Sequence, residues 1–471
     1  MSSRLEHVYA ASPVLLQNAA CSLIGAQNRF RRFGHDFHRR IAACEQRLTW
    51  GEGELLTYRD RRLVGHGRLA VETVPHYRDL ARSDGFTAAD LRSVDDIRAH
   101  FPVLMKSEVQ SLGERLRSEA AKPRRCAIVK TSGTTGAGVR ILVPYASTRE
   151  QWAVWWRYWH IHGITQKTRG AWFAGRTVVP PSVTQPPFWR YNLVGRQVLY
   201  SGYHLGPKYL DAYVMHLRQS GVRWLHGYPS NVALLASHML DRGYSLEGQV
   251  SVVTLAAENL TDHQRSTIAA AFGVTPFQHY GNAEAVANAS ECPHGTFHVD
   301  EDFAYVEAVK RTAEGVSALV GTNFTNPAFP LIRYDMGDIG TLTEQSCPCG
   351  RAGRALASVD GRLEDAIVLP SGARVGRLDH IFKDMGRIRE AQIYQPDVSA
   401  IVLRVARGDG YTAVDEHKLL SEARQRLGHE PKISIEYVER LPRTRTGKLR
   451  MVLSDVATGP AALVPDHEGG C

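Results

Sequence analysis

Apolar strands alternate with amphipathic helices between residues 207 and 280, and this pattern constrains the fold more than any other feature of the 471-residue sequence. The predicted strands cover residues 224–226, 250–256 and 274–280. One helix ends near Gly221, a second runs through residues 232–240, and a third starts at Thr261 and stops at Gly273. Such a rhythm is typical of a mostly parallel sheet with helices on its faces. The predicted class is therefore α/β, with ligands bound beyond the carboxyl ends of the strands.

The sequence before this segment is predicted to be largely helical. Residues 1–120 have helical character, and two short strands, Cys126–Lys130 and Arg140–Val143, follow them. The capping-box pattern Ser147–Glu150 predicts the start of a further helix. Four tryptophans fall on one face of that helix, namely Trp152, Trp155, Trp156 and Trp159.

The pattern changes near residue 361, where a second domain is predicted to begin. Short strands are expected around Gln392 and Ile401, a helix through Leu419–Leu427, and a strand through Ile433–Val438. We therefore expect a large α/β domain over residues 1–361, with mixed and parallel sheets flanked by helices. A small, mobile α+β domain is expected over residues 362–471.

Composition restricts the class of protein further. A formal net charge of +9 suits an anionic substrate, but the basic residues are scattered along the chain, so nucleic acid is not the expected partner. No run of about 18 apolar residues predicts a membrane span. Residues Tyr9–Asn28 are predicted to form an amphipathic helix packed on the body, and membrane contact is expected to be peripheral at most. The seven unevenly spaced cysteines favour a reducing, cytoplasmic location.

A run of small and hydroxylated residues, Thr131-Ser132-Gly133-Thr134-Thr135-Gly136, lies between the two short strands. Backbone N–H groups and hydroxyls in such a run can hold phosphates without obstruction by side chains. The run lacks the Gly-Lys-Ser/Thr ending of a Walker loop. We favour phosphate binding over a plain hairpin turn.

Three further segments carry charges suited to a nucleotide, although each has an ordinary alternative. Glu284 follows a predicted strand and suits Mg²⁺, or it is simply a carboxylate at a helix start. Asp335 and Asp338 lie in a compact loop that suits a ribose diol or a metal, or is a solvated turn. The segment Arg443–Arg450 is basic and contains Lys448; alone it indicates a solvated charge run or a nucleic-acid patch.

Taken together, these motifs resemble the adenylate-forming superfamily of acyl- and aryl-CoA ligases. The closer resemblance is to the phenylacetate–CoA ligase group, which includes coenzyme F390 synthetase-like and CapK-like proteins. It covers about residues 10 to 450. Besides the motifs above, it is carried by Leu15-Leu16-Gln17-Asn18, Val74-Pro75-His76-Tyr77-Arg78, His226-Gly227-Tyr228-Pro229-Ser230 and Cys347-Pro348-Cys349-Gly350-Arg351.

The resemblance implies a role for each motif. The Thr131–Gly136 loop would wrap the β- and γ-phosphates of ATP. Ala257, Glu258 and Asn259 would line the adenine, and Tyr280, beside Gly281, would pack against the base. Glu284 would bind Mg²⁺, Asp338 would bind the ribose, and Arg362 would contact the nucleotide. Glu364 would be the hinge residue, and Lys448 would be the catalytic residue. Lys448 would bridge the substrate carboxylate and the α-phosphate as they react.

Several positions depart from the usual pattern of this superfamily. Ala137 and Gly138 follow the phosphate loop, where Lys or Pro is usual, and Ala283 replaces a usual Ser or Thr. Glu364 stands at a hinge that is commonly Asp or Lys. None of these differences removes an essential charge, so catalytic activity remains the prediction.

A metal site is a separate hypothesis. Cys292, His298, Cys347 and Cys349 offer the thiolate and imidazole ligands that structural zinc prefers. Their spacing alone favours unrelated reduced cysteines, whereas the resemblance favours a structural Zn²⁺. His294 is the substitute ligand if His298 points away.

The acyl pocket and the acceptor are the least constrained by the sequence. Candidate pocket residues are Trp156, His226, Tyr228 and Ala283, and the small side chains after Gly281 suggest room for an aromatic or extended acid. The resemblance predicts a ligase that uses ATP and Mg²⁺ to form an acyl-AMP from a small carboxylic acid. CoA, another thiol or an amine remains open as the acceptor, as do acylation of an amino sugar, a non-catalytic nucleotide-binding role and a homodimer.

Overall fold

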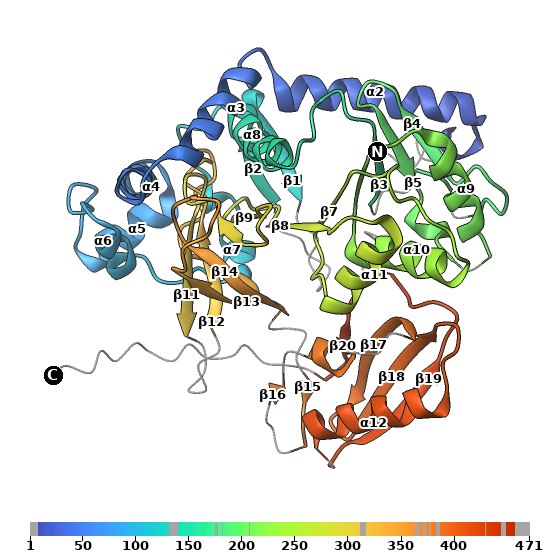
Figure 1. Cartoon of the computed structure of the whole chain (residues 1–471). Helices are drawn as coiled ribbons and strands as arrows, with labels where there is room; N and C mark the ends of the chain where they lie inside the picture. The colour runs from blue at the N-terminus through green and yellow to red at the C-terminus, as the bar shows by residue number, and fades with distance from the viewer. Residues whose placement is uncertain are drawn as a thin grey trace. The chain divides into compact units, whose positions relative to one another are not determined.

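The computed structural model resolves helices and strands along most of the chain (Figure 1). It describes residues 8–130, 140–174, 178–180, 182–206, 208–310, 317–362, 367–370, 374–375, 378–382, 387–428, 430–443 and 449–456. Contacts group these residues into two compact units. The first unit lies within Met1–Asn28, Ile164–Gln278 and Asp360–Pro460, and the second within Arg29–Gly163 and His279–Val359. Because the grouping follows contacts rather than sequence order, the domain boundary at residue 361 stays a prediction.

The alternating segment forms a largely parallel sheet in the first unit, as predicted. Its strands are β3 (Gly170–Phe173), β4 (Trp189–Asn192), β5 (Gln197–Tyr200), β6 (Trp224–Gly227) and β7 (Val252–Ala256). They lie in the order β7-β6-β3-β5-β4, and only the β4–β5 hairpin is antiparallel. Every residue of β6 and β7 is buried, which explains their apolar sequences. The predicted α/β class is confirmed.

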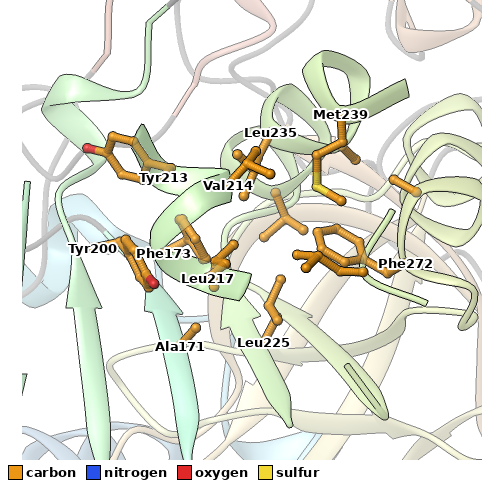
Figure 2. Packing of buried hydrophobic residues seen from close by; sticks show 14 of the residues in the cluster. Ala171, Phe173, Tyr200, Tyr213, Val214, Leu217, Leu225, Leu235, Met239 and Phe272 are labelled. Carbon is orange, nitrogen blue, oxygen red and sulfur yellow. The ribbon is translucent and has the colours of Figure 1, made fainter. Parts of the chain in front are cut away.

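Helices pack against this sheet and end where the sequence predicts. They are α9 (Leu210–Ser220), α10 (Pro229–Asp241) and α11 (Asp262–Phe272), and a short 3₁₀ turn covers Gly202–His204. The side chain of Thr261 caps α11, and Gly221 and Gly273 adopt left-handed backbone conformations that end α9 and α11. Figure 2 shows the apolar core between helices and sheet, in which the rings of Phe173 and Tyr200 stack with centroids 4.5 Å apart.

The predicted N-terminal helix is present as α2 (Val14–Phe33). In the first unit, the Gln17 side chain accepts a hydrogen bond from Arg190 Nε at 2.5 Å, and Asn18 Oδ1 accepts one from the backbone N–H of Tyr191 at 2.9 Å. These bonds fix one face of the helix on strand β4. Within the described ranges, no helix has the length and apolar character needed to cross a membrane.

The second unit combines a helical layer with an antiparallel sheet. Its helices are α3 (Phe37–Gln46), α4 (Glu52–Thr73), α5 (Pro75–Asp84), α6 (Val94–His100), α7 (Lys106–Leu112) and α8 (Tyr145–Ile161), with 3₁₀ turns at Arg47–Thr49, Gly113–Leu116 and Pro123–Arg125. The two short strands predicted before α8 are present as β1 (Cys126–Lys130) and β2 (Arg140–Pro144), which pair antiparallel. The apolar core lies among helices α4 to α7, strand β2 and two later strands, β11 (Tyr305–Lys310) and β13 (Tyr334–Thr343).

Seven further strands lie between residues 277 and 362, and most of their residues belong to this unit. They are β8 (Phe277–Gly281), β9 (Asn288–Glu291), β10 (Phe297–Val299), β11 (Tyr305–Lys310), β12 (Ser317–Thr322), β13 (Tyr334–Thr343) and β14 (Ala355–Arg362). Their order is β11-β12-β13-β14-β10-β9-β8. The predicted strand at 274–280 is therefore present as β8, which pairs antiparallel with β9.

Helix α8 corrects one detail of the sequence analysis. The helix begins at Tyr145, directly after Pro144, and no side chain caps it. Ser147 was expected to cap the helix, but it lies buried inside the first turn. Proline lacks a backbone N–H, which costs nothing at a position preceding the first helical hydrogen bonds. The tryptophans do share one region of the helix, with Trp156 and Trp159 centroids 4.9 Å apart.

A buried ion network joins helix α8 to the loop after β10. Arg157 donates hydrogen bonds to both carboxylate oxygens of Asp302, at 2.8 and 2.9 Å, and to Asp300 Oδ1 at 2.7 Å. Burial alone would raise the pKa of Asp302, but the guanidinium groups of Arg157 and Arg47 hold it well below its ordinary value. The stabilisation from this carboxylate is complete above its ordinary pKa of 3.8, and it is lost as the pH falls below that value.

The chain beyond residue 366 forms a small α+β layer within the first unit. It contains β15 (Ile367–Val368), β16 (Arg374–Val375), a 3₁₀ turn (Leu378–Phe382), β17 (Ile388–Asp397), β18 (Ala400–Arg407), α12 (Ala413–Leu427), β19 (Lys432–Tyr437) and β20 (Val452–Ser454). The four longer strands lie in the order β19-β18-β17-β20, and α12 covers one face of them (Figure 1). Its apolar core is formed by residues 367–452 alone, so this segment has a core of its own.

The buried ion network predicts a large effect of removing its cation. We expect Arg157→Met to lower the free energy of unfolding by about 3–5 kcal/mol, because Asp300 and Asp302 would remain buried without it. Urea denaturation at neutral pH measures this difference.

Arg117→Met is the matched control, since Arg117 pairs with Glu114 at the surface. Its free energy of unfolding should change by less than about 1 kcal/mol. Equal effects of the two substitutions would contradict the importance assigned to the buried network.

Candidate active site and metal centre

The residues directly after β7 form the first candidate segment. Ala257 has a φ of 72°, a left-handed conformation that a residue with a side chain rarely adopts. The next residue, Glu258, accepts hydrogen bonds from the backbone N–H of Ser230 at 3.1 Å and of Leu449 at 2.8 Å. Burial raises the pKa of the Glu258 carboxyl, although the hydrogen bond from Ser230 and the charge of Arg443 oppose that rise. Asn259, the last residue predicted to line the adenine, is exposed.

The residues on both sides of Lys448 bond to other parts of the first unit. Arg443 donates a hydrogen bond to Ser230 Oγ at 2.8 Å and forms an ion pair with Glu390. Arg443 and Leu449 face each other as an antiparallel bridge. Lys448 is among residues 444–448, which lie outside the described residues. The flanks of its loop are thus fixed next to Glu258 and the first turn of α10.

Tyr280 and Asp338 meet in the second unit. Tyr280 is on β8, Asp338 is on β13, and the Tyr280 hydroxyl donates a hydrogen bond to Asp338 Oδ2 at 2.6 Å. The resemblance assigns these two residues to the base and the ribose of one nucleotide. The fold therefore brings together two side chains that are 58 positions apart in the sequence.

Glu284 lies in the loop after β8, near the start of β13. The Tyr334 hydroxyl is 3.5 Å from Glu284 Oε1, and Asn323 Nδ2 donates to the Glu284 carbonyl at 3.2 Å. Gly281 ends strand β8, and Ala285 has a φ of 57°. The loop thus has a fixed backbone that carries a half-buried carboxylate, which is the ligand type that Mg²⁺ prefers.

Some predicted residues cannot be placed. The Thr131–Gly136 loop and Glu364 lie outside the described residues, and so does the side chain of Arg362, the last residue of β14. Ala257, Glu258 and Asn259 belong to the first unit, whereas Tyr280, Glu284 and Asp338 belong to the second. The complete nucleotide site therefore stays a prediction.

The candidate acyl-pocket residues occupy different surroundings. His226 is buried. Its Nδ1 is 2.9 Å from Thr254 Oγ1, and its ring contacts the ring of Trp172. Tyr228 is half-buried and directly precedes α10, without a capping hydrogen bond from its side chain. Ala283 is exposed in the loop after β8.

Trp156 packs in the helical layer, with its ring 6.0 Å from that of Phe33 and 6.5 Å from that of Phe37. Trp155 instead stacks on His279 of β8, with centroids 3.6 Å apart. Burial lowers the pKa of His279 to about 4, so its imidazole is neutral at physiological pH. Trp155 therefore contacts the strand that leads into the Gly281–Val286 loop.

The four predicted metal ligands come together in the second unit. Cys292 follows β9, His298 is on β10, and Cys347 and Cys349 lie between β13 and β14. Their ligand atoms all lie within 4.8 Å of one another, with 3.6 Å between the sulfurs of Cys292 and Cys347 and 3.2 Å between Cys349 Sγ and His298 Nε2. Sulfurs bound to one tetrahedral zinc lie about 3.8 Å apart. The donor set and the spacing therefore fit zinc, with His298 rather than the exposed His294 as the fourth ligand.

Sequence reasoning missed two partners of the candidate site. Ser230 donates its backbone N–H to Glu258, and Arg443 pairs with Glu390 and donates to Ser230 Oγ. Nothing in the local sequence of Ser230 or Arg443 identifies these partners. Ser230 belongs to the His226–Ser230 motif and Arg443 to the basic segment Arg443–Arg450, and these two motifs are the only sequence signal for them. The ion pair and hydrogen bonds depend on residues that are far apart in the chain.

Comparison with known proteins supports the resemblance seen in the motifs. Residues 367–455 match the model of the CapK C-terminal domain. The chain is 22% identical to protein CapK of Staphylococcus aureus over 469 residues, which covers 96% of this chain and 100% of CapK. It is 29% identical over 188 residues to the phenylacetate-coenzyme A ligase of Thermus thermophilus, or 38% of each chain.

The fold is similar to that of solved CoA ligases. A 2-hydroxyisobutyryl-CoA ligase in the postadenylation state has a TM-score of 0.67 at 18% identity, covering 87% of this chain and 92% of that ligase. The same ligase in the thioesterification state, in complex with 2-HIB-AMP and CoA, has a TM-score of 0.52. The chain thus has the fold of an adenylate-forming ligase with a C-terminal domain.

The clustered thiols and imidazole predict a bound metal. We expect purified protein to contain about one zinc per chain, because the four donors match a closed structural site. The double substitution Cys292→Ser, Cys347→Ser should remove the zinc and lower the thermal midpoint, as measured by elemental analysis and calorimetry.

Cys126→Ser is the control, because Cys126 is on β1 and outside the cluster. It should leave the zinc content unchanged. Wild-type protein with far less than one zinc per chain, when purified without chelators, would argue against the site.

Proposed function

We propose that this protein is an ATP-dependent ligase that activates a carboxylic acid as an acyl-AMP and transfers the acyl group to a thiol or an amine. The shared fold supports this proposal, since related structures hold acyl-AMP intermediates and CoA. Similarity to a phenylacetate-coenzyme A ligase supports it independently at the sequence level. The proposed first product is an acyl-AMP, and pyrophosphate leaves in the same step.

One contact carries the proposal. The backbone N–H of Leu449 donates to Glu258 Oε1 at 2.8 Å, so the residue next to Lys448 is held against the segment predicted to line the adenine. The ion pair of Arg443 with Glu390 and its bond to Ser230 hold the other side of the same loop. These contacts of the flanking residues support a role for Lys448 beside a nucleotide bound after β7.

The chemistry requires positive charge at that place. The substrate carboxylate attacks the α-phosphorus of ATP, the bond to the β-phosphate oxygen breaks, and pyrophosphate takes the electron pair. Both reactants are anionic, so the ammonium group of Lys448 would reduce their repulsion and stabilise charge on the α-phosphate. Glu284 would hold Mg²⁺, which supplies further charge neutralisation at the phosphates.

The second half-reaction then consumes the acyl-AMP. A thiol or amine attacks the acyl carbon, AMP leaves, and a thioester or an amide forms. Tyr280 and Asp338 would keep the nucleoside in place through both steps, because their 2.6 Å hydrogen bond orients the carboxylate for a ribose diol. Movement of the C-terminal segment between the two steps would open the acyl carbon to the acceptor.

CoA is the first candidate acceptor, since the related ligase structure includes it. An amine, such as an amino sugar, is the second candidate, because amide formation would consume the same acyl-AMP. A non-catalytic nucleotide-binding role is the remaining alternative. Pyrophosphate release measured across a panel of acids, with CoA or amines added afterwards, separates the three.

Lys448 gives the sharpest test of the proposed chemistry. We expect Lys448→Ala to reduce acid-dependent pyrophosphate release by about a hundredfold or more, because the charge on the α-phosphate would lose its partner. ATP binding measured by calorimetry should persist, since the phosphates keep their other contacts.

Lys432→Ala is the control, because Lys432 is an exposed lysine of the same C-terminal segment, on β19. Its activity should equal that of the wild type. Unchanged pyrophosphate release by the Lys448 variant would rule out its role.

Glu258 provides a second prediction for the same site. Glu258→Ala removes the acceptor of the Leu449 N–H, so we expect about tenfold slower adenylation at saturating ATP. The exposed Glu439→Ala in the same C-terminal segment should have no effect. Stopped-flow measurement of pyrophosphate release distinguishes the two, and equal rates would contradict the positioning role of this contact.

A further inference from the structure

Helix α2 exposes an apolar stripe along its outer face. Seven of the fifteen exposed large hydrophobic side chains in the described part of the chain lie within residues 8–30. The most exposed are Leu15 at 81%, Phe30 at 79% and Leu23 at 72%. Leu16, Leu23 and Phe30 follow one another at seven-residue spacing, which places them on one side of the helix. A stripe of this length on a protein surface indicates an interaction site.

A neighbouring turn extends the stripe into a patch. The turn between β4 and β5 carries Leu193, exposed at 73%, and Val194 at 37%. Its backbone is bonded to α2, because the N–H of Leu193 donates to Ser22 Oγ at 3.1 Å. Two segments that are 171 positions apart thus supply one apolar surface. We call Leu15, Leu16, Leu23, Ile24, Phe30, Leu193 and Val194 the α2 patch.

The patch is preformed and rigidly supported. The opposite face of α2 is fixed to β4 by the bonds from Arg190 and Tyr191 to Gln17 and Asn18. Cys21 is buried against Val178, Val179 and Leu199. The exposed leucines cannot rotate into the protein without breaking these contacts, so their burial requires another surface.

Helix α2 and the β4–β5 turn, which form the patch, carry charges of a single sign. No Asp or Glu occurs between His7 and His35 in the sequence. Helix α2 ends in basic residues, of which Arg29 and Arg31 are exposed, and Arg196 is exposed in the β4–β5 turn. A surface that offers apolar side chains beside arginines, without carboxylates, is complementary to an anionic lipid bilayer.

We propose that the α2 patch docks this protein on an anionic membrane surface. The leucines and Phe30 enter the boundary between headgroups and acyl chains, and the arginines contact lipid phosphates. A second copy docked patch against patch fits less well, because its own α2 and β4–β5 turn would bring no carboxylates to pair with Arg29, Arg31 and Arg196. The binding is peripheral and independent of the proposed acyl-AMP chemistry, so it requires no ATP.

Vesicle co-sedimentation of the full-length protein tests this proposal. Wild-type protein should bind vesicles of equal parts phosphatidylcholine and phosphatidylglycerol at low salt, and should bind pure phosphatidylcholine at least about tenfold more weakly. Added salt should weaken binding to the anionic vesicles.

Two sets of variants separate the two contributions. Leu16→Ser with Leu23→Ser should reduce binding about tenfold or more, because it removes apolar contact area. Arg29→Gln with Arg31→Gln should reduce binding to anionic vesicles without changing the weak binding to neutral ones. Val414→Ser with Leu240→Ser is the control, since these side chains are also exposed but lie on α12 and α10. Circular dichroism checks that every variant is folded.

The outcomes are distinct. Salt-sensitive binding to anionic vesicles that is reduced in both patch variants and kept in the control supports the proposal. Absence of wild-type binding to the anionic vesicles overturns it. So does a dimer, measured by light scattering without lipid, that becomes monomeric in the leucine variant, because a second copy then covers the patch.

Discussion

The buried ion network around Arg157 is the constraint on which the second unit depends. A guanidinium that is almost completely removed from water is stable only if carboxylates neutralise it and accept its hydrogen bonds. Asp300 and Asp302 do so, and Asp300 also pairs with Arg351, two residues beyond Cys349. Because Asp300 is two residues beyond His298, the same network fixes both ends of the candidate metal site. Helix packing, strand position and ligand geometry are thus coupled through one set of charges.

The proposed chemistry depends on the hydrogen bonds that Glu258 accepts. Glu258 sits at the end of a fully buried strand, where the backbone is strained at Ala257 and the carboxylate has two backbone donors. One donor belongs to α10 and the other to the C-terminal segment that carries Lys448. The Glu258 carboxylate therefore links the C-terminal end of β7 to a segment almost two hundred residues away. Such a link is suited to a reaction in which one segment has to reach and leave a nucleotide.

Helix α2 buries polar and small side chains and exposes large apolar ones. Gln17 and Cys21 face the protein and are buried, whereas Leu16 and Leu23 face outward. Hydrophobic burial within the chain does not explain the outward leucines, but membrane docking does. The sequence predicted a helix packed on the body, and the structure places polar and small side chains at the packed face. Which face of an amphipathic helix turns inward depends on its neighbours, so periodicity alone could not assign it.

The sequence by itself determined the elements whose causes are local. The strands and helices from β6 to α11 follow from residue spacing, from the cap at Thr261 and from Gly221 and Gly273, and the motif order indicated the adenylate-forming fold. The start of α8 was predicted three residues too late, because Pro144 rather than Ser147 precedes the helix and Ser147 is buried inside it. Only the tertiary structure decided that Cys292 meets Cys347, that Tyr280 meets Asp338 and that Trp155 reaches His279. These contacts join residues far apart in sequence, and their energies depend on burial and pairing that no local pattern encodes.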